Sequence, residues 1–150
     1  MLTIDHATPD DLPAICALLA AAALSIDDVN AALVDSLLVA RDDGRHLQGV
    51  VGLQRVAGGA LLRSLAVAAD ARSQGVGAGL LAAAEAQARA TGISTLYLLT
   101  TSAAPFFASR GYADHARDAA PEGIRGTAQF AGLCPAASAF MAKTLTPAME

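Results

Sequence analysis

The stretch RSQGVGAGLLAAAEAQARATG, residues 72–92, decides the fold of this chain. It places three glycines, Gly75, Gly77 and Gly79, at the start of an alanine-rich run. Glycine weakens a helix, so this position needs a reason. The first four N–H groups of a helix have no partner within it and carry partial positive charge. Bare backbone lets a phosphate approach them, so the stretch predicts an anion site that opens a helix over 76–90.

Three other kinds of structure also use closely spaced glycines and have to be compared with this stretch. A plain turn uses glycine for its backbone conformation, and this alternative stays open at this point. A P-loop needs a lysine after the glycines, and none follows. A dinucleotide-binding turn needs Gly or Ala where Leu80 stands and an acid at the end of the next strand, STLYLLTT (94–101), which has none. The P-loop and the dinucleotide fingerprint therefore fit poorly.

Composition restricts the class of protein. The 150 residues suit a single domain over 1–150, and 54% hydrophobic against 16% charged residues excludes disorder. No apolar run reaches the roughly 18 residues that span a bilayer. The N-terminus, MLTIDHATPDDL, does not resemble a secretory signal. We therefore expect a cytoplasmic protein without a membrane partner.

Charge and cysteine content point the same way. The net charge is −4 and no Lys or Arg cluster occurs, which argues against a nucleic-acid partner. Cys16 and Cys134 make no disulfide framework, so we expect two reduced thiols. His6, His46 and His115 lack the spacing of metal ligands, so we expect no metal.

Hydrophobic periodicity predicts alternating strands and helices. The expected strands cover 2–7, 36–41, 46–57, 60–68, 94–101 and 138–145. The first expected helix begins after Thr8, where Pro9 and Asp11 complete a helix start signal. Four more helices are expected within 27–35 and over 76–90, 104–109 and 122–130. The order β-α-α-β-β-β-α-β-α-β predicts a mixed α/β domain with one central sheet flanked by helices.

The helix over 76–90 has a predicted packing face and a predicted exposed face. Its packing face consists of Leu80, Leu81, Ala84 and Ala88. On the exposed side, we expect Glu85 and Arg89 to form a pair, because residues four apart are neighbours on a helix.

Two motifs together resemble those of the GCN5-related N-acetyltransferases (GNAT). LAV (65–67), a spacer and Arg72-x-x-Gly75-x-Gly77 are similar to the family pattern [QR]-x-x-G-x-[GA]. FFASRGY (106–112) resembles the family's second motif. The resemblance covers nearly the whole chain, including its element order, and implies the GNAT fold and acetyl-CoA as the cosubstrate.

The resemblance also implies which residues bind acetyl-CoA. In the family, backbone amides of the first motif bind the pyrophosphate, and the preceding strand pairs with the pantetheine arm. The residues assigned in this way are Leu65, Ala66, Val67, Arg72, Ser73, Gln74, Gly75, Val76, Gly77, Ala78 and Phe107.

A narrower group is similar as well: small acetyltransferases encoded with arsenic-resistance genes. The matching features are LLRSLAVA, RSQGVGAGLL, TLYLLTTSA, FFASRGY and FAGLCPAASAFM. This resemblance implies a role in detoxifying an arsenical or a related amine.

Acetyl transfer to an amine needs a hydrogen-bond donor for the thioester carbonyl and a proton for the departing thiolate. The resemblance assigns the carbonyl donor to a backbone N–H of 65–67, and we choose Val67. The family's usual acid is a tyrosine four positions before Gly111, where this chain has Phe107, which has no proton to donate. We expect Tyr112 to be a core aromatic. Either water or another hydroxyl therefore helps the thiolate to leave, or the acid lies elsewhere in the chain. Ser64 and Thr100 are the hydroxyl candidates for a catalytic role.

The acceptor is a small-molecule amine whose identity stays open. Arg63 is a candidate ligand for a carboxylate or arsonate; its alternative is an exposed strand arginine. Thr101 follows a strand end, where hydroxyls such as those of Thr100 and Thr101 more often cap the next helix. Cys134 could bind trivalent arsenic, although a lone cysteine is more often a small buried hydrophobe.

Three further points complete the sequence-based hypothesis. With no acid placed as a general base, a water relay deprotonates the amine. Exposed apolar strands in the C-terminal half would allow a homodimer. The rival hypothesis is a non-catalytic acetyl-CoA-binding sensor or interaction module, which Phe107 at the usual acid position favours.

Overall fold

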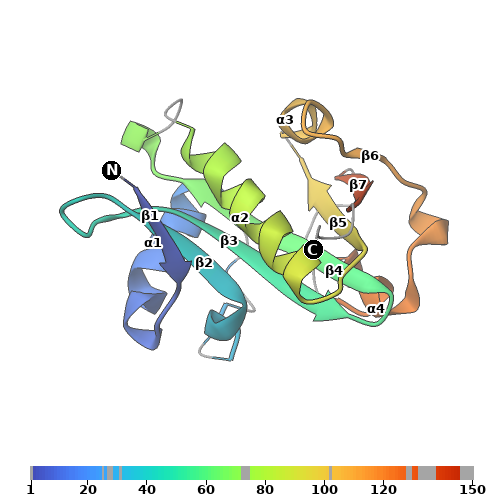
Figure 1. Ribbon diagram of the computed structural model, residues 1–150, viewed down its shortest axis with the longest axis horizontal. Coiled ribbons are helices and arrows are strands. Elements are labelled where there is room, and N and C mark those ends of the chain that lie inside the picture. Colours follow the sequence, from blue (N-terminus) through green and yellow to red (C-terminus); the bar gives the residue numbers. More distant parts are fainter. Residues whose placement is uncertain are drawn as a thin grey trace. The chain divides into compact units, whose positions relative to one another are not determined.

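The computed structural model describes residues 2–24, 26, 29–30, 32–71, 75–101, 103–127, 130–131 and 138–145 (Figure 1). The strands are β1 (Thr3–His6), β2 (Leu37–Arg41), β3 (Leu47–Val56), β4 (Gly59–Val67), β5 (Thr95–Thr100), β6 (Ala113–Asp114) and β7 (Ala139–Thr144). The helices are α1 (Leu12–Ala21), α2 (Val76–Ala90), α3 (Ala104–Ala108) and α4 (Glu122–Arg125). Short 3-10 turns are η1 (Pro9–Asp11), η2 (Val34–Ser36), η3 (Ala69–Ala71) and η4 (Arg117–Ala119).

The strands form one seven-stranded mixed sheet in the order β1-β2-β3-β4-β5-β7-β6. β4 and β5 are parallel, whereas β1 and β2, β2 and β3, β5 and β7, and β6 and β7 are antiparallel. The prediction of a mixed α/β fold with a central sheet flanked by helices is therefore confirmed. Among the residues described, no helix is both long and apolar enough to cross a bilayer.

The chain divides into two compact units. Unit 1 consists of Met1–Leu53 and Arg63–Ala86, and unit 2 consists of Gln54–Leu62 and Gln87–Glu150. Each unit has its own hydrophobic core, and each is considered by itself below.

In unit 1, α1 and α2 pack on opposite faces of the strands. Ile15 and Leu19 of α1 are fully buried with Val39 and Val50 in one core cluster. Neighbouring strand residues point to opposite faces, so Gly49 faces away from that cluster. A Cβ at Gly49 would lie 2.7 Å from Leu80 Cδ1 and 3.0 Å from Val76 Cγ1, both on α2. The missing side chain therefore lets the first turns of α2 lie close to β3.

In unit 2, α4 and η4 cover one face of the strands. The core cluster here contains Leu61, Tyr97, Ala120, Ile124 and Phe140. The rings of Tyr97 and Phe140 are stacked with centroids 5.7 Å apart, and Phe130 meets Phe140 edge-on at 5.4 Å. These aromatic contacts join β5 and β7 to the segment after α4.

Most expected elements occur close to their expected ranges, and the predicted capping box is present, since the Asp11 carboxylate accepts a hydrogen bond from the Thr8 N–H at 2.8 Å. Two expected helices are only partly described. Within 27–35 the described residues show the beginning of η2, and within 122–130 they show α4. The short strand β6 was not expected.

One side-chain prediction on α2 is wrong. Leu80, Leu81, Ala84 and Ala88 are buried as expected, but Glu85 is also buried, with 7% of its surface exposed. Position 85 follows Leu81 by four residues, so it falls on the same stripe of the helix as the apolar side chains. Glu85 therefore does not lie on an exposed face.

Candidate functional site

The carboxyl half of β4 contains a break in regular strand geometry. Ser64 has φ = 58° in the middle of the strand, a left-handed conformation that costs energy for any residue with a side chain. Its Oγ accepts a hydrogen bond from Arg63 Nε at 3.1 Å. Arg63 is only 6% exposed, so the alternative of an exposed strand arginine is wrong. Its side chain packs against Gly52 of β3, where a Cβ would approach Arg63 Cγ to 3.0 Å.

After the break, β4 presents the backbone that the family resemblance assigns to acetyl-CoA. The Ala66 side chain is buried in the unit 1 core, while Leu65 and Val67 are half-buried. The Ala68 N–H still donates to the carbonyl of Gln48 in β3 at 2.8 Å, and the backbone then turns, since the Ala71 N–H donates to the Ala68 carbonyl at 2.9 Å. η3 then leads toward the glycine stretch, where Arg72, Ser73 and Gln74 lie outside the described residues.

The start of α2 has the geometry that the glycine stretch predicts. Gly75 has φ = 79°, and a Cβ built on it would meet no described residue within 4 Å. The Gly79 N–H donates to the Gly75 carbonyl at 3.0 Å, so the helical hydrogen bonds begin there. The N–H groups of the preceding turn, which includes Val76, Gly77 and Ala78, have no acceptor within the helix.

These features fit a bound phosphate group. Open space at Gly75 and helix N–H groups of partial positive charge form a site for an oxyanion. Gly79 contributes less, because a Cβ there would meet Ile4 Cδ1 at an ordinary 3.6 Å. The fit therefore depends on Gly75 and the first turn of α2.

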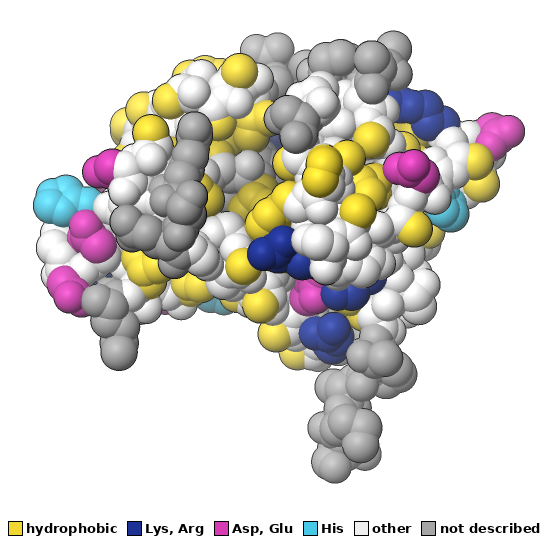
Figure 2. Space-filling model, turned by 90° about the horizontal axis from the view of Figure 1, so that it is seen from above, with side chains coloured by type: hydrophobic (Ala, Val, Ile, Leu, Met, Phe, Trp, Pro, Cys, Tyr) yellow, Lys and Arg dark blue, Asp and Glu magenta, His cyan; other side chains and the backbone are white. Residues whose placement is uncertain are grey.

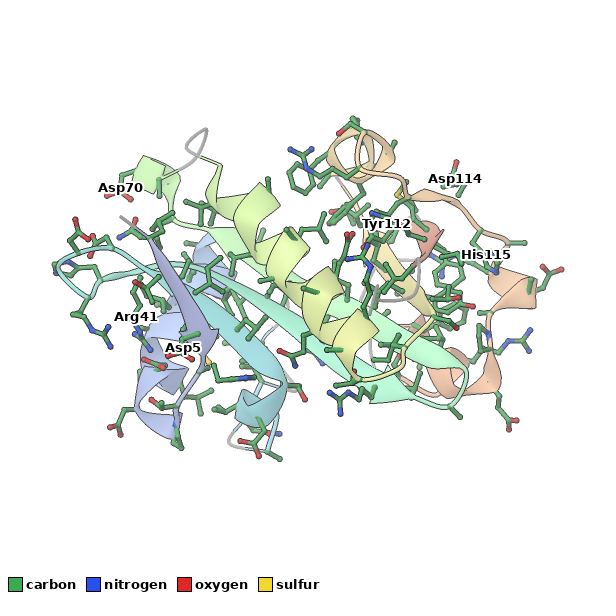
Figure 3. The ribbon with its side chains drawn as sticks, in the orientation of Figure 1. Asp5, Arg41, Asp70, Tyr112, Asp114 and His115 are labelled. Carbon is green, nitrogen blue, oxygen red and sulfur yellow. The ribbon has the colours of Figure 1, made fainter. Side chains whose placement is uncertain are left out.

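The second motif lies in unit 2 and forms an aromatic core. Phe107 is 5% exposed and meets Phe106 and Tyr112 edge-on, with ring centroids 5.1 and 5.6 Å away. The prediction that Tyr112 is a core aromatic is confirmed, since it is 3% exposed (Figure 3). Phe107 therefore has little ring surface left for a ligand. Gly111, with φ = 96°, makes the turn between the two rings.

The remaining predicted residues lie elsewhere in the chain or outside its described part. Thr100 Oγ1 accepts a hydrogen bond from the Ala103 N–H at 3.0 Å, in the turn before α3; the N-cap residue of α3 is Ala103, and no described side chain caps that helix, so the predicted capping role is wrong. Thr101 is exposed just after β5. Cys134 lies outside the described residues, and Cys16 is a half-buried free thiol packed against the unit 1 core. Within the described part of the chain, no His, Cys, Asp and Glu side chains group as metal ligands.

The sequence analysis missed two polar residues in unit 2. Arg117 Nη2 donates a hydrogen bond to the Ser138 carbonyl at 2.7 Å, across 21 positions of the chain. The Ser138 hydroxyl is buried and has no hydrogen-bond partner among the described residues. Their proximity depends on the pairing of β6 with β7, for which no local pattern exists.

A sequence model of the acetyltransferase (GNAT) domain matches residues 34–114, more than half of the chain. That range contains both motifs. A search among curated proteins gave no significant match.

Solved structures of acetyltransferases are similar in fold. N-acetylglutamate synthase from Neisseria gonorrhoeae, complexed with coenzyme A and N-acetyl-glutamate, is 27% identical with a TM-score of 0.86, over 97% of this chain and 35% of that chain. Rv2747 from Mycobacterium tuberculosis, in complex with CoA, is 20% identical with a TM-score of 0.79, over 96% and 99%. The ribosomal-protein-S18-alanine N-acetyltransferase from Escherichia coli is 21% identical with a TM-score of 0.65, over 100% and 97%. This chain thus spans about a third of the synthase chain.

Proposed function

Because the chain belongs to the GNAT acetyltransferase family, we propose that it is an N-acetyltransferase that moves an acetyl group from acetyl-CoA directly to the amine of a small molecule. A single catalytic domain over 1–150, in the cytoplasm, is part of this proposal. The observation that carries it is the open, left-handed Gly75 at the start of α2, beyond the end of β4.

Acetyl-CoA would be held by backbone rather than by charged side chains. The pyrophosphate would take the N–H groups at the start of α2, including those of Val76, Gly77 and Ala78. The pantetheine arm would lie along Leu65–Val67, and Arg72, Ser73 and Gln74 belong to the proposed site by the family resemblance alone. When bound, the cosubstrate supplies the thioester carbonyl that the amine attacks.

The catalytic roles follow from hydrogen-bonding capacity. Val67 N–H is the proposed donor to the carbonyl oxygen as it becomes negative. Ser64 Oγ accepts the Arg63 Nε–H, so its own proton remains available to stabilise the departing thiolate. Thr100 is assigned instead to the turn before α3, because its hydroxyl oxygen accepts the Ala103 N–H. A water relay takes the proton of the attacking amine.

The acceptor is proposed to be a small amino acid or a related amine, with arsenical amino acids and amine toxins included. The likeness to N-acetylglutamate synthase supports an amino acid. The resemblance to arsenic-resistance acetyltransferases supports an arsenical, and Cys134 and Thr101 are the candidate contacts that belong to that hypothesis. A homodimer is compatible with this function but is not required by it.

Calorimetric titration of acetyl-CoA tests the first half of the proposal, with NADH and ATP as controls. Binding of acetyl-CoA alone in the micromolar range is expected. Acetyl transfer is then measured with a panel of amines that includes organoarsenicals. Binding without transfer to any amine would instead favour the rival function, a non-catalytic acetyl-CoA-binding module, for which the buried Phe107 is the specific observation. Absence of binding would remove both functions.

A further inference from the structure

We infer that Arg117, Ser138 and Thr101 form a binding site for an oxyanion, a carboxylate or its arsenic analogue, carried by the acceptor. The inference rests on the proposed function and restricts the range of amines that can be its acceptor. Among the open classes it selects amines that carry an anionic oxygen group over polyamines. All three residues belong to unit 2.

Strand register brings the three residues to one end of β5. Thr100, the last residue of β5, pairs with Ala139, the first residue of β7. If the same register continued by one position, Thr101 would lie opposite Ser138. Arg117 reaches the same point through its hydrogen bond to the Ser138 carbonyl. Ligands of open α/β sheets bind outside the carboxyl ends of the parallel strands, and β5 is one of these strands.

Arg117 is held in place by its neighbours, and no acidic side chain among the described residues pairs with its guanidinium group. Its guanidinium lies 5.6 Å from the centre of the Phe130 ring, and the residue is half-buried. Within the described chain, no Asp or Glu forms an ion pair with it. The sequence over 123–139 contains no acid either. The bond to Ser138 uses one of the five guanidinium donors, so several remain for a carboxylate.

A second observation, made at Ser138, also indicates a bound ligand. Its residue is 5% exposed, and its hydroxyl has no partner among the described residues. A buried hydroxyl without a partner costs free energy, so such a group needs a physical reason. An oxyanion bound to Arg117 would accept the hydrogen bond that this hydroxyl lacks.

The segment that carries Arg117 is held by aromatic contacts. Figure 2 shows one face of the molecule, on which acidic, basic and hydrophobic side chains are mixed. His115, labelled in Figure 3, lies two positions before Arg117, and its ring meets Tyr97 and Phe140 edge-on at 5.6 Å. The segment that positions Arg117 is therefore fixed on the aromatic core.

The test compares amino acids with their carboxamides, and with spermidine, as acetyl acceptors. The wild type is expected to acetylate the free acids with the higher kcat/KM. Arg117→Gln should raise the KM for the best free acid about 10- to 100-fold, the effect of losing a charge-assisted hydrogen bond. It should change the KM for acetyl-CoA, and the kcat/KM for the matching carboxamide, by less than about threefold. Arg117→Lys should recover part of the loss.

Arg125→Gln is the matched control, because Arg125 also donates to a backbone carbonyl, that of Asp118, in the same unit. It should leave all constants unchanged. Ser138→Ala should raise the KM for the acid a few-fold, whereas a merely structural orphan hydroxyl could be removed without effect on KM. The inference is overturned if acids and amides are used equally, or if Arg117→Gln affects both alike. No transfer to any amine would instead refute the proposed function, and the inference with it.

Discussion

Arg63 donates its Nε–H to the Oγ of Ser64, the next residue in β4, over 3.1 Å. Ser64 is left-handed, with φ = 58°, while Arg63 is buried. A strand residue in this conformation shifts the alternation of the side chains that follow. The pair therefore sets how the backbone of Leu65–Val67 is presented.

Ser64→Val should destabilise the protein by about 2–3 kcal/mol, because a β-branched residue is strained at positive φ and the Arg63 Nε–H loses its acceptor. Ser64→Asn should stay within about 1 kcal/mol of the wild type, since asparagine tolerates this conformation and can accept the bond. Urea unfolding measures both. Thr95→Val, the same kind of exchange in regular strand β5, is the control and should be close to neutral. Equal midpoints for Ser64→Val and the control would contradict strain at this residue.

Gly75→Asp should abolish detectable acetyl-CoA binding, because a carboxylate would occupy the space and repel the phosphates. Its fold should survive, since a Cβ there meets none of the described residues within 4 Å. Gly92→Asp is the matched control: Gly92, just beyond the C-terminus of α2, has φ = 83° and the same open space. Both variants should lose about 1–2 kcal/mol of stability, and only the first should lose affinity in calorimetry. Unchanged affinity for Gly75→Asp would remove the assigned anion site.

Gly49→Ala should weaken both stability and acetyl-CoA binding. The added methyl would lie 2.7 Å from Leu80 Cδ1 and 3.1 Å from the Ala66 carbonyl, so the Leu80 side chain or α2 itself must shift. Overpacking of this kind costs about 1–3 kcal/mol. Gly126→Ala, with its nearest neighbour at 3.7 Å, should cost less than about 1 kcal/mol and leave affinity unchanged. Thermal unfolding with and without acetyl-CoA separates the two effects, and identical results for both variants would argue against close packing of α2.

Local patterns account for what could be predicted from the sequence. The start of α2 at Val76 follows from glycines, helical periodicity and helix-end chemistry, all within about 20 residues. β6 has only two residues, too few for a periodic pattern. Ser64 gives no warning of its left-handed backbone, because serine occurs in regular strands too. The contact between Arg117 and Ser138 depends on strand pairing far apart in the chain, which sequence periodicity does not specify.

The ion pair of Asp11 and Arg41 should make stability depend on pH. Arg41 Nη2 lies 2.5 Å from the Asp11 carboxylate (Arg41 is labelled in Figure 3). The hydrogen bond from Arg41 lowers the pKa of Asp11 below its ordinary 3.8, against desolvation and with help from Thr8. The unfolded chain then binds the proton more tightly, so the stabilisation is complete above about pH 5 and is lost as pH falls through the lowered pKa.

Unfolding free energies from about pH 7 to about pH 2.5 should therefore fall less steeply in Asp11→Asn than in the wild type. Arg41→Gln supplies the control, because without the guanidinium the effect of Asp11→Asn on the pH slope should largely vanish. A slope that Asp11→Asn leaves unaltered would show that other carboxyl groups cause the acid sensitivity.

Substitutions at Thr100 distinguish a hydroxyl that stabilises a turn from a hydroxyl that takes part in catalysis. Thr100 Oγ1 accepts the Ala103 N–H at 3.0 Å, at the entry to α3. Thr100→Val removes the acceptor and should cost about 1 kcal/mol, whereas Thr100→Ser keeps it and should cost less than half of that. Because we assign this hydroxyl to the turn before α3, kcat should change less than about threefold in either variant once each is assayed well below its unfolding temperature. A large loss of kcat in Thr100→Val that Thr100→Ser restores would return Thr100 to the catalytic step, since only a reacting hydroxyl links activity to the oxygen independently of stability.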